Sequence, residues 1–205
     1  MKYLRPAIAF TLFFIVVTGL AFPALIWGVS QAVFPHQANG SLIKDAQGKV
    51  VGSELLGQNF SDAKYFHPRP SAAGSGYDAA NSSGTNLGPS SDKLINGIAD
   101  DPKTEADESY SGVKQLAEAY RKENELASDA KLPSDAVTRS ASGLDPHISL
   151  ENAKMQVNRI ANARGVQEER VLQVIAQCSE DRFLGIYGEP RVNVLKANLA
   201  LNALN

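Results

Sequence analysis

The most apolar part of the chain lies near its start. Residues 7–29 (AIAFTLFFIVVTGLAFPALIWGV) are apolar apart from Thr11 and Thr18, and no charge occurs between residues 6 and 43. As a helix this segment would be roughly 34 Å long, enough to cross a hydrocarbon core of about 30 Å. The pattern therefore predicts a single N-terminal transmembrane helix.

The charges that flank this segment predict its orientation. Lys2 and Arg5 precede it, and the next cation is Lys44. Because cations collect on the cytoplasmic side, we expect a cytoplasmic tail at residues 1–6, a transmembrane helix at 7–29 and an extracytoplasmic domain at 30–205. The alternative is a cleaved signal peptide ending at Ser30-Gln31-Ala32, although the apolar run is longer than such peptides use. Both alternatives place the large domain on the same side.

Small residues within the helix indicate a place where another helix could pack. Ala24, Gly28 and Ala32 recur at four-residue steps and form one stripe, which would allow close approach of a partner helix. Small residues are also common in any membrane helix. Pro23 removes a backbone donor and crowds the carbonyl of Gly19, so a kink is expected there.

Beyond the helix, short hydrophobic patterns predict an α+β domain in which helices predominate. Residues 40–56 read as a β-hairpin that turns at Ala46-Gln47-Gly48. Five amphipathic or capped segments read as helices: 92–98 after the cap Ser91, 110–126, 150–164 ended by Gly165, 168–178, and the segment that follows Pro190. About 170 residues suit one domain of this kind.

A long segment rich in turn residues interrupts these patterns. Residues 58–91 are dominated by Gly, Ser, Ala, Asn and Pro, but they also carry Phe60, Tyr65, Phe66 and Tyr77. Loops this long are usually functional, and disordered linkers rarely contain so many aromatic residues. We therefore expect an ordered loop in which Phe60, Phe66 and Tyr77 form a docking surface. The alternative is that they pack the core of their own domain.

Charge and composition exclude several classes of function. Without Lys2 and Arg5, 18 Lys and Arg remain against 22 Asp and Glu, a net charge of −4, which argues against nucleic acid as a partner. The single cysteine, Cys178, lies on the apolar face of its predicted helix and reads as a buried thiol. His36, His67 and His147 are too far apart in sequence to form a metal-spaced pair, so no metal site is expected.

Catalytic motifs are also missing from the sequence. Neither a nucleophile elbow nor a phosphate-binding loop occurs. Residues 74–79 (GSGYDA) match a dinucleotide fingerprint, but the preceding HPRPSAA cannot form the buried strand that this fingerprint needs. No catalytic residue is therefore expected.

Three longer motifs resemble a known family. Residues 66–91 (FHPRPSAAGSGYDAANSSGTNLGPSS), 135–149 (DAVTRSASGLDPHIS) and 188–202 (GEPRVNVLKANLALN) resemble the KdpC family, the C subunits of bacterial Kdp potassium-transporting P-type ATPases. The N-terminal helix and the length fit this family as well. The resemblance implies a location in the bacterial inner (plasma) membrane. The partners that it implies are a channel-like potassium-binding subunit, a P-type ATP-hydrolysing subunit and a very small membrane peptide.

The resemblance also implies a role and a nucleotide contact. KdpC-like chains are regarded as catalytic chaperones that raise the ATP affinity of the pump subunit, so ATP and potassium would be handled by the complex, without a covalently bound cofactor. The nucleotide contact carried over from the family would involve Ser140, Ser142, Gly143 and Gln156. The alternative is that residues 140–143 form a turn that precedes a helix. ATP is cytoplasmic, whereas the charges place this domain outside.

Two other functions remain to be weighed against an accessory subunit. In the first, the chain is a membrane-anchored extracytoplasmic potassium-binding module, with Asp78, Asn81 and Asn86 as hard oxygen ligands. In the second, it is an anchored envelope enzyme, which would need a catalytic constellation that the sequence does not display.

Overall fold

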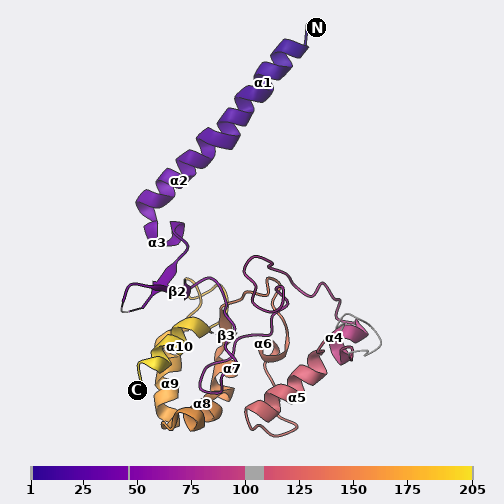
Figure 1. The fold of residues 1–205 in the computed structure, drawn as a ribbon, viewed down its shortest axis with the longest axis vertical. Helices are drawn as coiled ribbons and strands as arrows, with labels where there is room; N and C mark the ends of the chain where they lie inside the picture. Colours follow the sequence, from indigo (N-terminus) through magenta and orange to yellow (C-terminus); the bar gives the residue numbers. More distant parts are fainter. Residues whose placement is uncertain (1, 46, 100–108, 205) are drawn as a thin grey trace. The chain divides into compact units, whose positions relative to one another are not determined.

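The computed structural model describes residues 2–45, 47–99 and 109–204, and the chain divides into a unit ending at Ser53 and a unit beginning at Glu54 (Figure 1). The predicted turn residue Ala46 lies outside the described residues. Each unit is considered by itself.

The N-terminal unit begins with one continuous helical run. It consists of α1 (Leu4–Val16), the π-helix η1 (Val17–Ala21) and α2 (Phe22–Val33). The run from Leu4 to Val33 has 30 residues and is long and apolar enough to cross a membrane. A single N-terminal apolar helix is therefore confirmed. It extends beyond residues 7–29 at both ends, and the part that lies in the bilayer stays a prediction.

A π-helical turn lies just before Pro23, where a kink was expected. The kink itself stays a prediction. Pro23 has no N–H to donate to the carbonyl of Gly19, four residues earlier. In the turn that precedes it, the N–H of Phe22 instead donates to the carbonyl of Val17, five residues back. Thr18 Oγ1 also donates to the carbonyl of Phe14 at 2.6 Å. The wider turn thus rearranges backbone hydrogen bonds next to the missing donor.

A short helix and a hairpin complete this unit. Helix α3 (Pro35–Ala38) leads to β1 (Leu42–Lys44), which pairs antiparallel with β2 (Val50–Ser53). The predicted hairpin is confirmed. Its turn is organised by Asp45, whose Oδ1 accepts hydrogen bonds from the N–H groups of Gln47 and Lys49. The hairpin groups with the N-terminal unit, and the second unit begins at Glu54. The extracytoplasmic domain expected at residues 30–205 stays a prediction.

The second unit is mainly helical and contains one small sheet. Its elements are α4 (Asp92–Asn96), α5 (Val113–Glu123), α6 (Ser134–Val137), β3 (His147–Ser149), α7 (Leu150–Met155), α8 (Val157–Arg164), α9 (Glu168–Cys178), β4 (Ser179–Glu180), β5 (Arg191–Asn193) and α10 (Val194–Asn202). The sheet has the antiparallel order β3-β5-β4, with Ile148 opposite Val192. The α+β class with predominating helices is confirmed.

Two apolar clusters stabilise the second unit. The larger one joins the sheet to α8, α9 and α10, where α9 packs against both other helices (Figure 1). Phe66, Ile160, Val171, Val192 and Leu201 are completely buried in it. The smaller cluster is formed by Tyr120 of α5 and Ala136 and Val137 of α6.

The helix boundaries agree with the sequence where a cap is present and differ where tertiary contacts decide. Ser91 caps α4 by accepting from the N–H of Leu94, and Gly165 ends α8 in the left-handed region with φ 65°. The predicted helix 150–164 is instead divided at Gln156 into α7 and α8. The segment after Pro190 begins as strand β5, and its helix starts only after Asn193, whose side chain accepts from the N–H of Lys196.

Candidate functional site

The long loop is ordered by buried side chains of distant helices. Residues 58–90, all of them described, form neither helix nor strand. Asn198 accepts from the N–H of Phe66 at 2.7 Å and donates to its carbonyl at 3.0 Å. Gln156 makes the same pair of bonds with His67, at 2.7 and 3.1 Å. Each carboxamide is at most 1% exposed and occupies the place that a neighbouring strand would take.

The paired hydrogen bonds of Asn198 and Gln156 act as a clamp on the loop, and a buried arginine adds further bonds to it. Nη1 of Arg159 donates to the carbonyls of Ala63 and Tyr65 at 2.6 and 3.0 Å, and its Nη2 donates to Oε1 of Gln156 at 2.7 Å. Nε donates to the side chain of Asn124. Burial lowers the pKa of Arg159, yet an arginine in a protein stays charged. The guanidinium therefore holds residues 63–67 through charge-assisted hydrogen bonds.

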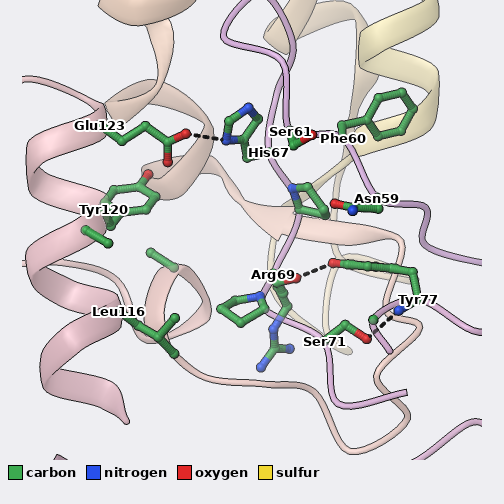
Figure 2. Close-up of a pocket in the computed structure, with 15 residues that line it drawn as sticks. Asn59, Phe60, Ser61, His67, Arg69, Ser71, Tyr77, Leu116, Tyr120 and Glu123 are labelled. Carbon is green, nitrogen blue, oxygen red and sulfur yellow. Dashed lines mark hydrogen bonds and ion pairs between the residues drawn. The ribbon is translucent and has the colours of Figure 1, made fainter. Parts of the chain in front are cut away.

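The clamped loop forms one wall of an open groove of about 370 Å³ (Figure 2). The opposite wall is α5, which contributes Leu116, Tyr120 and Glu123. A hydrogen bond of 2.8 Å between His67 Nδ1 and Glu123 Oε1 connects the two walls. The hydrogen bond from His67 lowers the pKa of Glu123, outweighing the effect of its partial burial. The groove is thus a fixed feature with polar and aromatic lining.

Tyr77 lines this groove, but its hydroxyl and its backbone N–H both donate hydrogen bonds within the loop. Its hydroxyl donates to the carbonyl of Arg69, and its N–H donates to Ser71 Oγ at 2.9 Å (Figure 2). Its φ of 57° lies in the left-handed region, which few residues other than glycine adopt. Burial raises the pKa of Tyr77, so its phenol stays protonated and continues to donate. Tyr77 therefore stabilises the turn that presents it.

The three aromatic residues predicted as a docking surface occupy different environments. Phe66 is 0% exposed and belongs to the core, so the docking role expected for it does not fit its position. Phe60 is half-buried and packs on the same core, with its ring 5.5 Å from that of Tyr65. Phe60 and Tyr77 both line the groove, and their docking role stays a prediction.

Residues 140–143 pack tightly against the loop. The carbonyl of Ser142 accepts from the N–H of Ser83 at 3.0 Å and from Ser82 Oγ at 2.9 Å. Gly143 has φ +67°, and a Cβ there would lie 2.7 Å from the backbone of both Ala73 and Ser83. Glycine is required at this position because a side chain would separate the two segments. The segment thus has the properties of a structural turn.

The structure does not bring together the four residues implied to contact nucleotide. Ser140 is 8% exposed, and Ser140 and Ser142 line a surface hollow together with Arg69 and Asp145. Gln156 does not line that hollow. It is 0% exposed, and its amide group is bonded to His67, Arg159 and Asn152. A nucleotide could reach it only if this cluster opened.

Arg69 links the loop to the segment before β3. Its Nη1 donates to Asp145 Oδ2 at 2.8 Å. Burial by itself would raise the pKa of Asp145, but hydrogen bonds from His147 and Arg69 outweigh it and lower this pKa to about 2. Arg69 Nε is buried without a hydrogen-bond partner in the described part of the chain. This ion pair therefore connects the loop to the segment before β3, and it is lost when acid protonates Asp145.

The carboxylate oxygens of Asp78, considered above as potassium ligands, already accept hydrogen bonds from neighbouring residues of the loop. Asp78 Oδ1 accepts from the N–H of Ala80 at 2.9 Å, and Oδ2 accepts from the side chain of Asn81 at 2.6 Å. These bonds lower the pKa of the Asp78 carboxyl, with the side-chain bond from Asn81 as the largest cause. Within residues 2–45, 47–99 and 109–204, no group of three His, Cys, Asp or Glu side chains is arranged to hold a metal ion.

The small residues Ala24, Gly28 and Ala32 are all exposed on α2. A Cβ built on Gly28 meets nothing within 4 Å, so the stripe is open to a neighbouring helix. Their role as an interface stays a prediction.

Two features of the second unit were missed from the sequence. The clamps made by Gln156 and Asn198 have no local signal, because a buried amide on a helix looks like a surface amide in the sequence. The second feature is a turn at residues 183–187 whose large apolar side chains are exposed. Its signal was available as a short apolar run, FLGIY, which contains Gly185, is followed by Gly188 and lies outside any helical period.

Comparisons with known proteins agree with the resemblance seen in the sequence. Residues 4–203 match the family model described as "KdpC: K+-transporting ATPase, c chain". The chain is 47% identical over 203 residues to proteins of Mycobacterium bovis and Mycobacterium tuberculosis named "Potassium-transporting ATPase KdpC subunit", with 99% of both chains covered. A protein of the same name from Caulobacter vibrioides is 49% identical, with 99% of this chain and 94% of the relative covered. The chain therefore belongs to the KdpC family, the c chains of potassium-transporting ATPases.

Proposed function

We propose that this chain is a non-catalytic accessory subunit that assembles and stabilises an ATP-driven, high-affinity potassium import complex. The observation that carries the proposal is the family match, which covers nearly the entire chain. Its partners would be the potassium-binding subunit, the ATP-hydrolysing subunit and the small membrane peptide of that complex. The chain would be a single-pass protein of the bacterial inner membrane.

The proposed arrangement places residues 1–6 in the cytoplasm and the large unit outside. Lys2 and Arg5 support this orientation because cationic flanks remain in the cytoplasm. The open face of Gly28 supports helix packing against a membrane-embedded partner. The clamped loop supports docking by Phe60 and Tyr77, since a rigid surface loses little entropy on binding.

An effect of this chain on ATP affinity would be indirect. Gln156 is completely buried and lies outside the surface hollow that Ser140 and Ser142 line, so these residues do not share one open nucleotide contact. In the proposed orientation, only the short N-terminal tail shares a compartment with ATP. We therefore propose that the chain raises ATP affinity by holding the transport and ATP-hydrolysing subunits in their productive arrangement, as a catalytic chaperone would.

The test is to prepare the complex with and without this chain. The complete complex should hydrolyse ATP with a lower KM for ATP, whereas the incomplete complex should dissociate more readily and show a KM raised several-fold. An incomplete complex of equal stability and equal KM would refute the proposal. Photo-crosslinking with an azido-ATP analogue gives the second readout: labelling of this chain would replace the indirect route by a direct contact.

A further inference from the structure

The middle of the apolar N-terminal helix contains two backbone carbonyls that have lost their usual donors. In a regular α-helix, the carbonyls of Thr18 and Gly19 accept from the N–H groups of residues 22 and 23. Here the N–H of Phe22 donates to the carbonyl of Val17, and Pro23 has no N–H. Both losses therefore fall on neighbouring residues of the π-helical turn.

The remaining donors of the helix cannot satisfy both carbonyls. The next N–H along the chain belongs to Ala24, which in a regular helix serves a third carbonyl. The hydroxyl of Thr18 is a donor at the same level, but it is directed to the carbonyl of Phe14 at 2.6 Å. Within Leu4–Val33, all of which the structure describes, at least one of the two carbonyls therefore needs a donor from outside the helix.

These carbonyls lie at the depth where water is scarcest. Residue 18 is midway along the span 7–29 that is predicted to cross the bilayer. Lipid chains offer no hydrogen-bond donor, so a backbone carbonyl at this depth is strongly destabilised unless protein satisfies it. The surface beside it is open: Thr18 and Gly19 are exposed, and a Cβ built on Gly19 would meet nothing within 4 Å. A donor on a neighbouring helix can therefore approach the backbone closely.

A second copy of this chain lacks a suitable donor. Copies share one orientation across the membrane, because the same flanking charges direct each of them. A second copy would thus bring its own Thr18 to this depth, and that hydroxyl already donates within its helix. The other polar side chains of the span, Thr11 and Trp27, lie more than about 10 Å away along the axis. The missing donor therefore belongs to a different membrane protein.

We propose that the carbonyls of Thr18 and Gly19 form an acceptor site for a polar side chain, of the Ser, Thr, Asn or Gln type, on a transmembrane helix of another subunit of the potassium-transporting ATPase. Such side chains form hydrogen bonds between membrane helices. The inference rests on the proposed function and adds a directional contact at mid-bilayer. Small residues only allow a helix to approach, whereas a hydrogen bond also determines the depth and the face at which the partner helix packs.

Carbonyl chemical shifts test the site directly, because a carbonyl carbon moves to lower field when its oxygen accepts a hydrogen bond. Thr18-Gly19 is the only Thr-Gly pair in the sequence, so threonine labelled with carbon-13 at the carbonyl and glycine labelled with nitrogen-15 isolate the Thr18 signal. Labelled glycine and leucine give two signals, from Gly19 and Gly143, and Gly19→Ala identifies the first. The full-length chain is measured alone in bilayers and in the assembled complex. At least one of the two carbonyls should move to lower field on assembly.

Each other source of a donor has its own outcome in these spectra. Unchanged signals from both carbonyls, in a complex that retains the large subunits, would overturn the proposal. A shift that already appears when the isolated chain is crowded in the bilayer would assign the site to a second copy. Magnetisation transfer from water to these carbonyls would assign it to solvent, and either result overturns the proposal. Failure of the wild-type chain to recover the large subunits would instead overturn the proposed function.

A variant that restores the missing donor gives a second test. Pro23→Ala supplies the N–H that Gly19 lacks, so the Gly19 signal should lie at lower field already in the isolated chain. Recovery of the large subunits in a pull-down should fall about three-fold, the average effect of one hydrogen bond between membrane helices. The matched control is Pro35→Ala, which adds the same N–H at the first position of α3, where a helix needs no donor. Membrane levels of both chains report insertion, and equal recovery for the two variants would count against the acceptor site.

Discussion

At the scale of single residues, buried amides replace a strand beside the loop. Gln156 and Asn198 each bond both the N–H and the carbonyl of one residue, His67 and Phe66. A loop rich in glycine and serine gains most from such bonds because it has little apolar surface of its own. The sequence could predict that the loop is ordered, from its aromatic residues. It could not identify the residues that order it, because they lie about 90 and 130 positions away.

Gln156→Ala should destabilise the chain by about 3 kcal/mol, since it leaves several buried polar groups of the loop and of Arg159 without partners. Gln173→Ala is the matched control: Gln173 lies on the exposed side of α9, and its replacement should change stability by less than about 0.5 kcal/mol. Thermal unfolding of the purified full-length chains in detergent measures both. Equal melting temperatures for the two variants would show that the clamp contributes little.

The titration of Asp145 should make the stability of the folded chain depend on pH over a defined acidic range. Its pKa is about 2 in the folded chain and 3.8 ordinarily, so the carboxylate contributes stability that is complete above pH 4 and lost as the pH falls through about 2. The difference corresponds to about 2 kcal/mol. Asp145→Asn should therefore be less stable than the wild type at pH 7, and the gap should narrow as the pH approaches 2. A gap that is constant between pH 7 and pH 3 would contradict this origin.

Two substitutions separate the contribution of the Tyr77 hydroxyl from that of its ring. Tyr77→Phe removes the bond to the Arg69 carbonyl and should cost about 1 kcal/mol of stability without loss of partner subunits. Tyr77→Ala also removes the ring that lines the groove, so it should weaken recovery of the partners if the groove docks them. Pull-down and melting temperature are measured on the same preparations. A large fall in the melting temperature of Tyr77→Ala, with partners retained, would make Tyr77 a core residue.

At the scale of helices and strands, the sequence predicted the features that depend on neighbouring residues. The caps at Ser91 and Gly165 and the apolar face of α9 were read correctly because they depend on neighbours in sequence. Strand β5 was predicted as the start of a helix, since Val192 fits a helical period. The pairing of β5 with β3 and β4 decides its structure, and those strands lie more than 40 and 10 residues before it. Gln156 divides α7 from α8 for the same reason: tertiary bonds determine its position.

The membrane helix offers a test of the small-residue stripe. Gly28→Leu should leave insertion intact, because leucine is at least as apolar as glycine, but it should reduce recovery of the large subunits by blocking close helix approach. Ala7→Leu is the control, since it adds similar bulk near the other end of the helix and outside the stripe. Pull-down from solubilised membranes gives the comparison. Equal recovery for the two variants would remove Ala24, Gly28 and Ala32 as an interface.

At the scale of the whole molecule, one apolar helix and one folded unit were predicted from hydropathy alone. Periodicity does not reveal that the hairpin at residues 42–53 groups with the N-terminal unit, because this grouping depends on contacts. The orientation across the membrane is a property of the charges at the two ends of the helix. It determines which compartment the loop can reach.

The orientation is tested by enzyme fusions to the C-terminus. Alkaline phosphatase, which is active only outside the cytoplasm, should be active after residue 205, and green fluorescent protein at the same place should be dark. The physical reason is that Lys2 and Arg5 hold the N-terminus inside, while no cation follows before Lys44. The control replaces Lys2 and Arg5 by Asn and adds lysines between residues 34 and 43, which should invert both signals. A mature N-terminus at Val33, found by sequencing the purified chain, would mean that the helix is removed, and the membrane role of the Gly28 stripe would then be lost while the outer location of the folded unit would remain.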